Sequence, residues 1–125
     1  MESKVKKTVL VVDDNELNLK LFRSIIMITP YSIIEALDAE TGIEMARTQK
    51  PDLILMDIQL PRMDGVTATK ILREDPSMKS VPILAITGNT NISDEMETCF
   101  DDYILKPFDL KKFIEKLDHY LKDLS

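Results

Sequence analysis

The side chains of this chain that could do chemistry are acidic, hydroxyl and basic groups that each follow a short apolar run. They are Asp13, Asp14, Asp57, Thr87 and Lys106. Carboxylates that share one pocket repel one another and need a compensating cation. Oxygen ligands without a neighbouring His or Cys favour Mg²⁺ over zinc. If the fold gathers these residues, three carboxylates are balanced in formal charge by one Mg²⁺ and one lysine.

Each of these residues also has an ordinary structural explanation. Asp14 or Asn15 could cap a helix, and Asp57 could begin the turn before Pro61. Thr87 could bond to nearby backbone donors in a turn, and a single lysine is most often a solvated surface residue. Their common position after separate apolar runs favours a functional site over four unrelated coincidences.

The elements that would position these residues alternate between short strands and amphipathic helices. Apolar runs predict strands at 8–12, 31–36, 53–56, 81–86 and 103–105. Helical periodicity predicts helices at about 15–27, 38–49, 66–73 and 110–121, the second with Asp38 as N-cap, and a short helix at 91–99. Continuous apolar strands are typical of a parallel sheet that is buried on both faces.

This alternation predicts an α/β fold with an open parallel sheet and helices on both faces. Five strands are too few for an eight-stranded barrel. A chain of 125 residues has room for one domain, expected to span 1–125. Ligands of open α/β sheets bind outside the carboxyl ends of the strands, which is where all the polar residues named above are expected.

Composition excludes several classes of function. The net charge of −6 opposes binding to a phosphate backbone, so no nucleic-acid partner is expected. No apolar run approaches the ~20 residues of a membrane-spanning helix, and residues 1–7 lack the apolar stretch of a signal peptide. A single cysteine, Cys99, fits a reducing compartment. We therefore expect a cytoplasmic protein that does not insert into membranes.

Four blocks of sequence resemble the signature motifs of response-regulator receiver domains, the CheY-like superfamily. They are VVDDNELNLKLF at 11–22, PDLILMDIQLPRMDG at 51–65, AIT at 85–87 and YILKPF at 103–108. Their order and spacing cover nearly the whole chain and are most similar to single-domain regulators of the DivK type and to receiver modules of hybrid histidine kinases. The resemblance implies a flavodoxin-like fold with strand order 2-1-3-4-5, which places the first and third strands side by side.

The resemblance also implies a role for each acidic residue. Asp57 matches the phosphoacceptor, a carboxylate nucleophile that forms an aspartyl phosphate. Asp14 matches a direct Mg²⁺ ligand and Asp13 one that acts through water. The backbone carbonyl of Gln59 would complete the protein ligands, and Mn²⁺ could replace Mg²⁺.

The remaining motif residues match groups that respond to the phosphoryl group. Lys106 would pair with its oxygens, and the Thr87 hydroxyl would move toward it. Tyr103 matches an aromatic residue that turns inward behind the hydroxyl, although it could equally be an ordinary strand residue. Lys106–Pro107 resembles the cis peptide of the family.

The function implied is that of a two-component response regulator. A phosphohistidine of a histidine kinase or phosphotransfer protein would donate to Asp57, and the product would change contacts with a downstream protein. This is a switch and not an enzyme in the usual sense. The alternatives are a module excised from a hybrid histidine kinase, an inert receiver, and a Mg²⁺-dependent phosphohydrolase. The phosphohydrolase class is disfavoured, because Asp13-Asp14-Asn15 does not match its Asp-x-Asp motif and no cap domain is present.

Two features depart from the family or exceed what a core requires. Residues 87–106 are shorter than in typical relatives by roughly one helical turn, with CFDD at 99–102, which predicts a shortened fourth helix. In the first helix one apolar stripe is expected to face the core, and further apolar residues widen it. The expected stripe is Leu17, Leu21, Ile25 and Ile28; the extension is Leu19, Phe22 and Ile26. We expect the extension either to dock the helical bundle that carries the phosphohistidine or to pack under neighbouring loops.

Overall fold

Five parallel strands form the centre of the molecule in the computed structural model, which describes residues 6–88 and 99–122. The strands are β1 (Thr8–Val12), β2 (Ser32–Ala36), β3 (Leu53–Asp57), β4 (Ile83–Thr87) and β5 (Asp102–Leu105). Their order is β2-β1-β3-β4-β5, and every neighbouring pair is parallel. The α/β fold class and the strand order expected from the sequence are confirmed.

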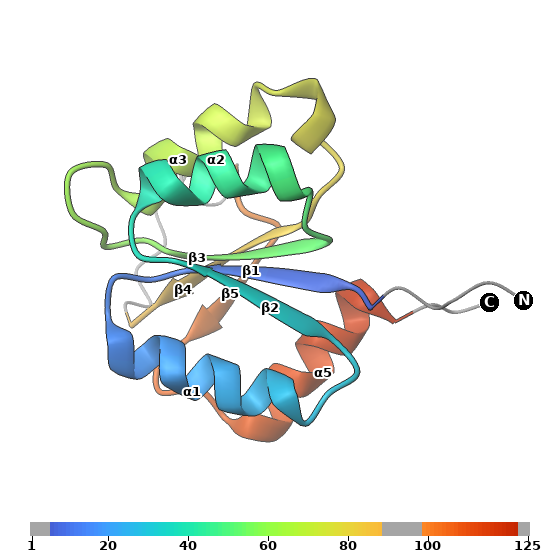
Figure 1. Ribbon diagram of the computed structural model, residues 1–125. Coiled ribbons are helices and arrows are strands. Elements are labelled where there is room, and N and C mark those ends of the chain that lie inside the picture. Colours follow the sequence, from blue (N-terminus) through green and yellow to red (C-terminus); the bar gives the residue numbers. More distant parts are fainter. Residues whose placement is uncertain (1–5, 89–98, 123–125) are drawn as a thin grey trace, which may run out of the picture.

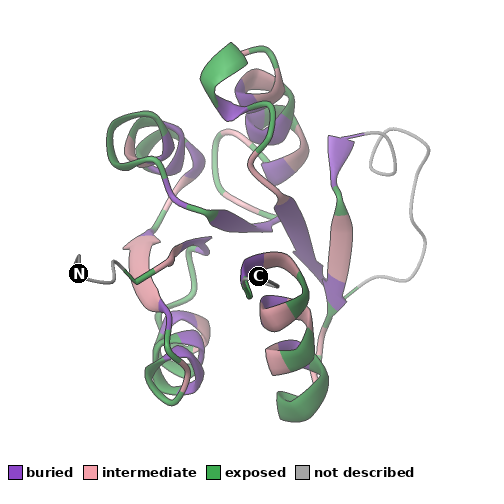
Figure 2. Cartoon of the chain, turned by 90° about the vertical axis from the view of Figure 1, so that its right-hand side faces the viewer, coloured by how far each residue is buried: buried purple, intermediate pink, exposed green. Residues whose placement is uncertain are grey.

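Helices cover both faces of this sheet (Figure 1). α1 (Glu16–Met27) and α5 (Leu110–Leu121) lie on one face, and α2 (Ala39–Gln49) and α3 (Gly65–Arg73) lie on the other. Buried residues concentrate in the sheet and on the helix sides that face it (Figure 2). β1, β3 and β4 lie inside the sheet and are almost wholly buried, which explains their continuous apolar runs.

Local sequence signals explain where the helices begin. Asn15 is the N-cap of α1, and its Oδ1 accepts hydrogen bonds from the amides of Leu17 (2.8 Å) and Asn18 (3.1 Å). Asp38 caps α2, as predicted, through the amide of Thr41. Since Asn15 serves as the cap, α1 does not require Asp14 for that purpose.

The expectation for α1 is wrong about which side of the helix faces the core. Leu19, Phe22 and Ile26 are 2%, 0% and 1% exposed, and the Phe22 ring stacks on Phe108 with centroids 5.1 Å apart. These three side chains therefore belong to the core and cannot dock a partner. Leu17 and Leu21, placed in the core by the sequence pattern, are 76% and 47% exposed.

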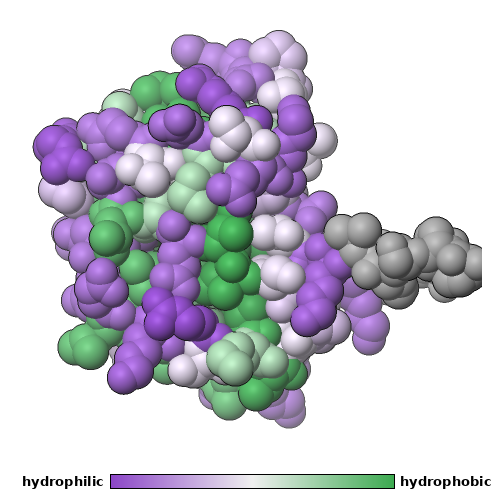
Figure 3. Space-filling model, in the orientation of Figure 1, coloured by the Kyte–Doolittle hydropathy of each residue, from purple (hydrophilic) through white to green (hydrophobic). Residues whose placement is uncertain are grey.

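Exposed apolar surface also occurs on the outside of the molecule. In the orientation of Figure 1, hydrophobic residues lie among hydrophilic ones on the face that carries β2 and α1 (Figure 3). The half-buried strand β2 is the edge of the sheet on this side. In the part of the chain that the structure describes, no helix combines the length and apolar character needed to cross a bilayer.

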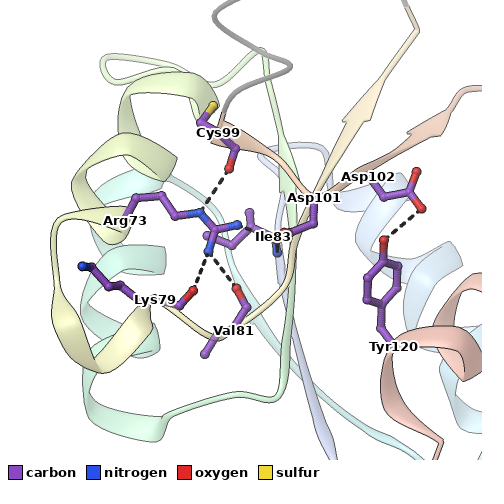
Figure 4. A network of polar contacts seen from close by, with 8 residues as sticks. All are labelled: Arg73, Lys79, Val81, Ile83, Cys99, Asp101, Asp102 and Tyr120. Atoms are coloured by element: carbon purple, nitrogen blue, oxygen red, sulfur yellow. Dashed lines mark hydrogen bonds and ion pairs between the residues drawn. The ribbon is translucent and has the colours of Figure 1, made fainter.

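The unusual CFDD segment is held by an arginine of α3 (Figure 4). Arg73 donates to the backbone carbonyls of Cys99 (3.1 Å) and Val81 (3.0 Å) and pairs with the Asp101 carboxylate. Phe100 is buried beside Tyr103. The fourth helix expected at 91–99 falls almost entirely on residues 89–98, which lie outside the described residues.

Candidate functional site

The pairing of β1 with β3 brings two of the predicted acidic residues together. Val12 is the register partner of Met56. Asp13 and Asp57, the next residues of the two strands' chain segments, therefore lie side by side at the carboxyl edge of the sheet. One oxygen from each of Asp13, Asp14 and Asp57 lies within 4.8 Å of the other two. Asp13 and Asp57 are buried, whereas Asp14 is exposed. The predicted acidic cluster is therefore present in the structure.

Asp13 is held by two residues of the α1 N-terminus. Its side chain is fully buried. Oδ1 accepts a hydrogen bond from the backbone amide of Asn15 (2.9 Å), and Oδ2 accepts one from the side-chain amide of Asn18 (3.2 Å). Both donors are neutral, so they orient the carboxylate without adding positive charge beside it.

Asp57 lies at the end of β3 between one anion and one cation. Its Oδ1 accepts a hydrogen bond from the Gln59 amide at 3.0 Å, and its Oδ2 is 3.6 Å from the ammonium nitrogen of Lys106. Burial, and to a lesser degree the neighbouring Asp13 carboxylate, raise the pKa of Asp57 to about 6, although the Gln59 amide and Lys106 act to lower it. A bound cation would relieve this unfavourable approach of two carboxylates.

Lys106 and Thr87 are placed by the pairing of β4 with β5. Thr87 is the register partner of Leu105, and the backbone amide of Lys106 donates to the Thr87 carbonyl at 2.8 Å. Both side chains line a pocket of about 270 Å³ together with Asp57 and Gln59. The pocket thus offers an ammonium group and a hydroxyl group next to the carboxylate of Asp57.

The backbone on the far side of Asp57 requires a glycine that sequence reasoning missed. A Cβ at Gly65 would lie 2.2 Å from the Asp57 carbonyl oxygen and 2.9 Å from the Ile58 Cα. The Gly65 amide donates to the Ile58 carbonyl at 2.9 Å. The start of α3 therefore packs directly against the backbone that carries the acidic residue.

Comparison with known proteins agrees with this arrangement. The family model described as the response regulator receiver domain matches residues 9–118. This chain belongs to the response-regulator receiver family. The receiver domain is 40% identical over 120 residues to the polar-differentiation response regulator DivK of Brucella anthropi, an alignment that covers 94% of this chain and 98% of the relative. DivK of Brucella ovis gives the same identity and coverage.

Solved structures share the fold of this receiver domain. The receiver domain of the sensor histidine kinase PA1611 from Pseudomonas aeruginosa PAO1 is 28% identical, has a TM-score of 0.87, and covers 95% of this chain and 100% of its own. That structure has a magnesium ion coordinated in its active-site cleft. The N-terminal domain of a response regulator receiver protein from Methanoculleus marisnigri JR1 is 30% identical, with a TM-score of 0.75 and coverage of 93% and 97%.

The donor set of this receiver domain fits Mg²⁺. Asp13, Asp14 and Asp57 supply hard carboxylate oxygens close together, which is the chemistry that Mg²⁺ prefers. Burial, and to a lesser degree the Asp13 carboxylate, raise the pKa of Asp57, so a cation at this place would stabilise the ionised carboxylate. Gln59 lines the adjacent pocket, and the role of its carbonyl as a further ligand stays a prediction.

Two further expectations from the sequence concern residues of β5 and the loop after it. The Lys106–Pro107 peptide bond is cis, as predicted. Tyr103 is half-buried, with its ring centroid 6.2 Å from that of Phe100. Its inward movement upon phosphorylation stays a prediction, as does the movement of Thr87.

Proposed function

We propose that this receiver domain is a cytoplasmic phosphorylation switch of a two-component system, with Asp57 as the acceptor. The observation that carries the proposal is the convergence of three carboxylates on one point, with Lys106 3.6 Å from the Asp57 carboxylate. Phosphoryl transfer needs mainly positioning and neutralisation of charge, and this site offers both.

The proposed reaction is a transfer between a histidine and an aspartate. A carboxylate oxygen of Asp57 attacks the phosphorus of a phosphohistidine on the partner protein, the P–O bond forms, and the P–N bond breaks. The electron pair of the broken bond stays on the imidazole nitrogen. Asp57 must be ionised to attack, and a pKa of about 6 leaves most of it ionised at neutral pH.

The chain's other residues hold the reacting groups. Asp13 and Asp14 would hold the metal ion together with Asp57, and Mg²⁺, or Mn²⁺ in its place, would supply positive charge to the phosphoryl oxygens. Lys106 would pair with one of these oxygens, and the Thr87 hydroxyl would donate to another. The added charge and acceptor oxygens would then bias the conformation of Thr87 and Tyr103 and alter contacts with a downstream protein.

The protein that donates the phosphoryl group is proposed to dock on the exposed side of α1. Leu17 and Leu21 are exposed there. A pocket of about 370 Å³ is lined by Leu21 together with Lys106, Pro107 and Phe108 of the β5–α5 loop. Because Lys106 also lines the Asp57 pocket, a helical bundle seated on this surface lies next to the acceptor.

The deciding experiment is intact-mass spectrometry after treatment with a small acyl phosphate. With Mg²⁺ the wild type should gain one phosphoryl group, and Asp57→Asn should gain none. Omitting Mg²⁺ should slow the reaction strongly. A stable adduct on another residue would contradict the assignment, and continuous release of phosphate from exogenous phosphate esters would favour a hydrolase.

A further inference from the structure

We propose that Asn18 is a positioning residue of the metal site, which holds the buried Asp13 carboxylate in the orientation that the cation requires. The inference rests on the proposed function, because it concerns the Mg²⁺ site of that function. It is carried by the hydrogen bond from the Asn18 side-chain amide to Asp13 Oδ2 at 3.2 Å.

Two hydrogen bonds together fix the plane of the Asp13 carboxylate. The Asn15 amide binds one oxygen at 2.9 Å, and Asn18 binds the other. A carboxylate has about four lone-pair sites, so each oxygen keeps a lone pair that a cation or its bound water could use. If the Asn18 amide were lost, the carboxylate could rotate about its remaining anchor, and a fully buried oxygen would lack its donor.

The position of Asn18 in α1 explains how it reaches Asp13. Asn15 is the N-cap, so Asn18 is the third residue of the helix. Side chains in the first turn of a helix lean back toward its N-terminus, and a side chain at this position commonly reaches back to the cap. Here it extends past the cap to the residue that follows β1.

The chemical type of Asn18 also matters. Its amide donates a hydrogen bond to Asp13 without adding positive charge. A lysine or arginine at this place would neutralise Asp13 and repel the cation. A neutral donor therefore orients the carboxylate and preserves its attraction for the metal ion.

Mg²⁺ binding to the unphosphorylated protein tests this role without any partner, which matters because Asn18 also lines the proposed docking pocket. The ¹H–¹⁵N NMR spectrum, followed during titration with Mg²⁺, gives the dissociation constant and reports on the fold. Asn18→Leu, which keeps the size and removes the donor, should weaken Mg²⁺ binding about tenfold. Lys20→Ala, on the exposed side of the same helix, should bind as the wild type does. If Asn18→Leu fails to fold, Asn18→Ser, which is too short to reach Asp13, should show the same loss.

A double-mutant cycle shows whether Asn18 acts through Asp13. In Asp13→Asn, which keeps the other two carboxylates, adding Asn18→Leu should cause no further loss of affinity. Losses that add in free energy would overturn the proposal, as would wild-type affinity in both Asn18 variants. A wild type that binds no Mg²⁺ would instead refute the proposed metal site and the inference with it.

Discussion

Arg73, the last residue of α3, contacts the carboxylate of Asp101, and this contact joins α3 to the backbone that precedes β5. The Asp101 oxygen that contacts the Arg73 guanidinium also accepts a hydrogen bond from the Ile83 amide at 2.8 Å. Asp101 and Ile83 are further joined by a backbone hydrogen bond of 2.9 Å. One arginine thus organises the approach to β4, which ends at Thr87, and to β5, which Lys106 follows.

Replacing Arg73 should destabilise the fold. In Arg73→Leu the carboxylate of Asp101 and the carbonyls of Cys99 and Val81 lose a donor, so the free energy of unfolding should fall by about 2 kcal/mol. Urea unfolding followed by circular dichroism measures this loss. Arg47→Leu is the matched control, because the Arg47–Asp75 pair lies at the surface and should contribute less than about 1 kcal/mol. Equal losses in the two variants would contradict the proposed role of Arg73.

Gly65 should tolerate no side chain. In Gly65→Ala the new Cβ meets the Asp57 carbonyl oxygen, so the unfolding free energy should fall by about 1–3 kcal/mol. The same clash should displace Asp57 away from Lys106. Chemical denaturation gives the first effect, and the phosphorylation rate with a small donor gives the second. A Cβ at Gly88 meets no atom within 4 Å, so Gly88→Ala should unfold at nearly the wild-type denaturant concentration.

The strand positions and the carboxyl-edge site could be predicted because local sequence encodes both. Strands buried on two faces appear as unbroken apolar runs, and the polar residues directly follow them. The side of α1 that faces the core could not be predicted in this way. About half of its circumference is apolar, so periodicity alone does not decide which half faces the sheet. The contact of Phe22 with Phe108 decides it, and that contact joins residues far apart in the sequence.

Asn18 and Gly65 were missed for a related reason. Asn18 appears in the sequence as an ordinary polar helix residue, although a donor in the third helical position after an Asn cap is a usable signal. Gly65 follows Asp64, the N-cap of α3. Only the close approach of α3 to the backbone after β3 shows why a glycine is needed there.

The contribution of Asp57 to the stability of the metal-free protein should fall as the pH rises. The pKa of Asp57 is about 6 in the folded chain against an ordinary value of 3.8, so between these values the folded state binds more protons than the unfolded state. The Asp57 contribution to the unfolding free energy should therefore decline from about pH 4 to pH 6 and stay lower above it, by on the order of 2 kcal/mol, relative to Asp57→Asn. Denaturation in EDTA at several pH values measures the decline. Asp57→Asn should be more stable than wild type at pH 7 and nearly equal at pH 4; a decline of the same size in this variant would assign it to another group.

Removal of the Lys106 charge should slow phosphorylation. In Lys106→Met the phosphoryl oxygens lose a cation, and the pKa of Asp57 should rise further because Lys106 lowers it. We expect a phosphorylation rate about 10²-fold lower with a small acyl phosphate at pH 7. Intact-mass spectrometry measures this rate. Lys112→Met, in a residue of α5 that lines a different pocket, should react at the wild-type rate. A normal rate in Lys106→Met would exclude the proposed role.

Substitution of Leu21 should slow phosphoryl transfer from a protein donor and leave transfer from a small donor unchanged. Leu21→Asn removes exposed apolar surface beside the pocket of Lys106 and Phe108, so transfer from a phosphorylated histidine-kinase core that reacts with wild type should slow about tenfold. The rate with a small acyl phosphate should not change. Met27→Asn, which alters a more exposed apolar residue at the C-terminal end of α1, serves as control. Equal slowing with both donors would show damage to the acceptor site instead of to docking.

The side-by-side pairing of β1 and β3 has a consequence for folding. Asp13 and Asp57 stand 44 positions apart in the chain and become neighbours only when Val12 pairs with Met56. A partly folded species without this pairing lacks the proposed metal site, so a divalent ion bound there would stabilise only the completed sheet. Magnesium in the surrounding medium would then act as a selective check on correct assembly, before any signal reaches the protein.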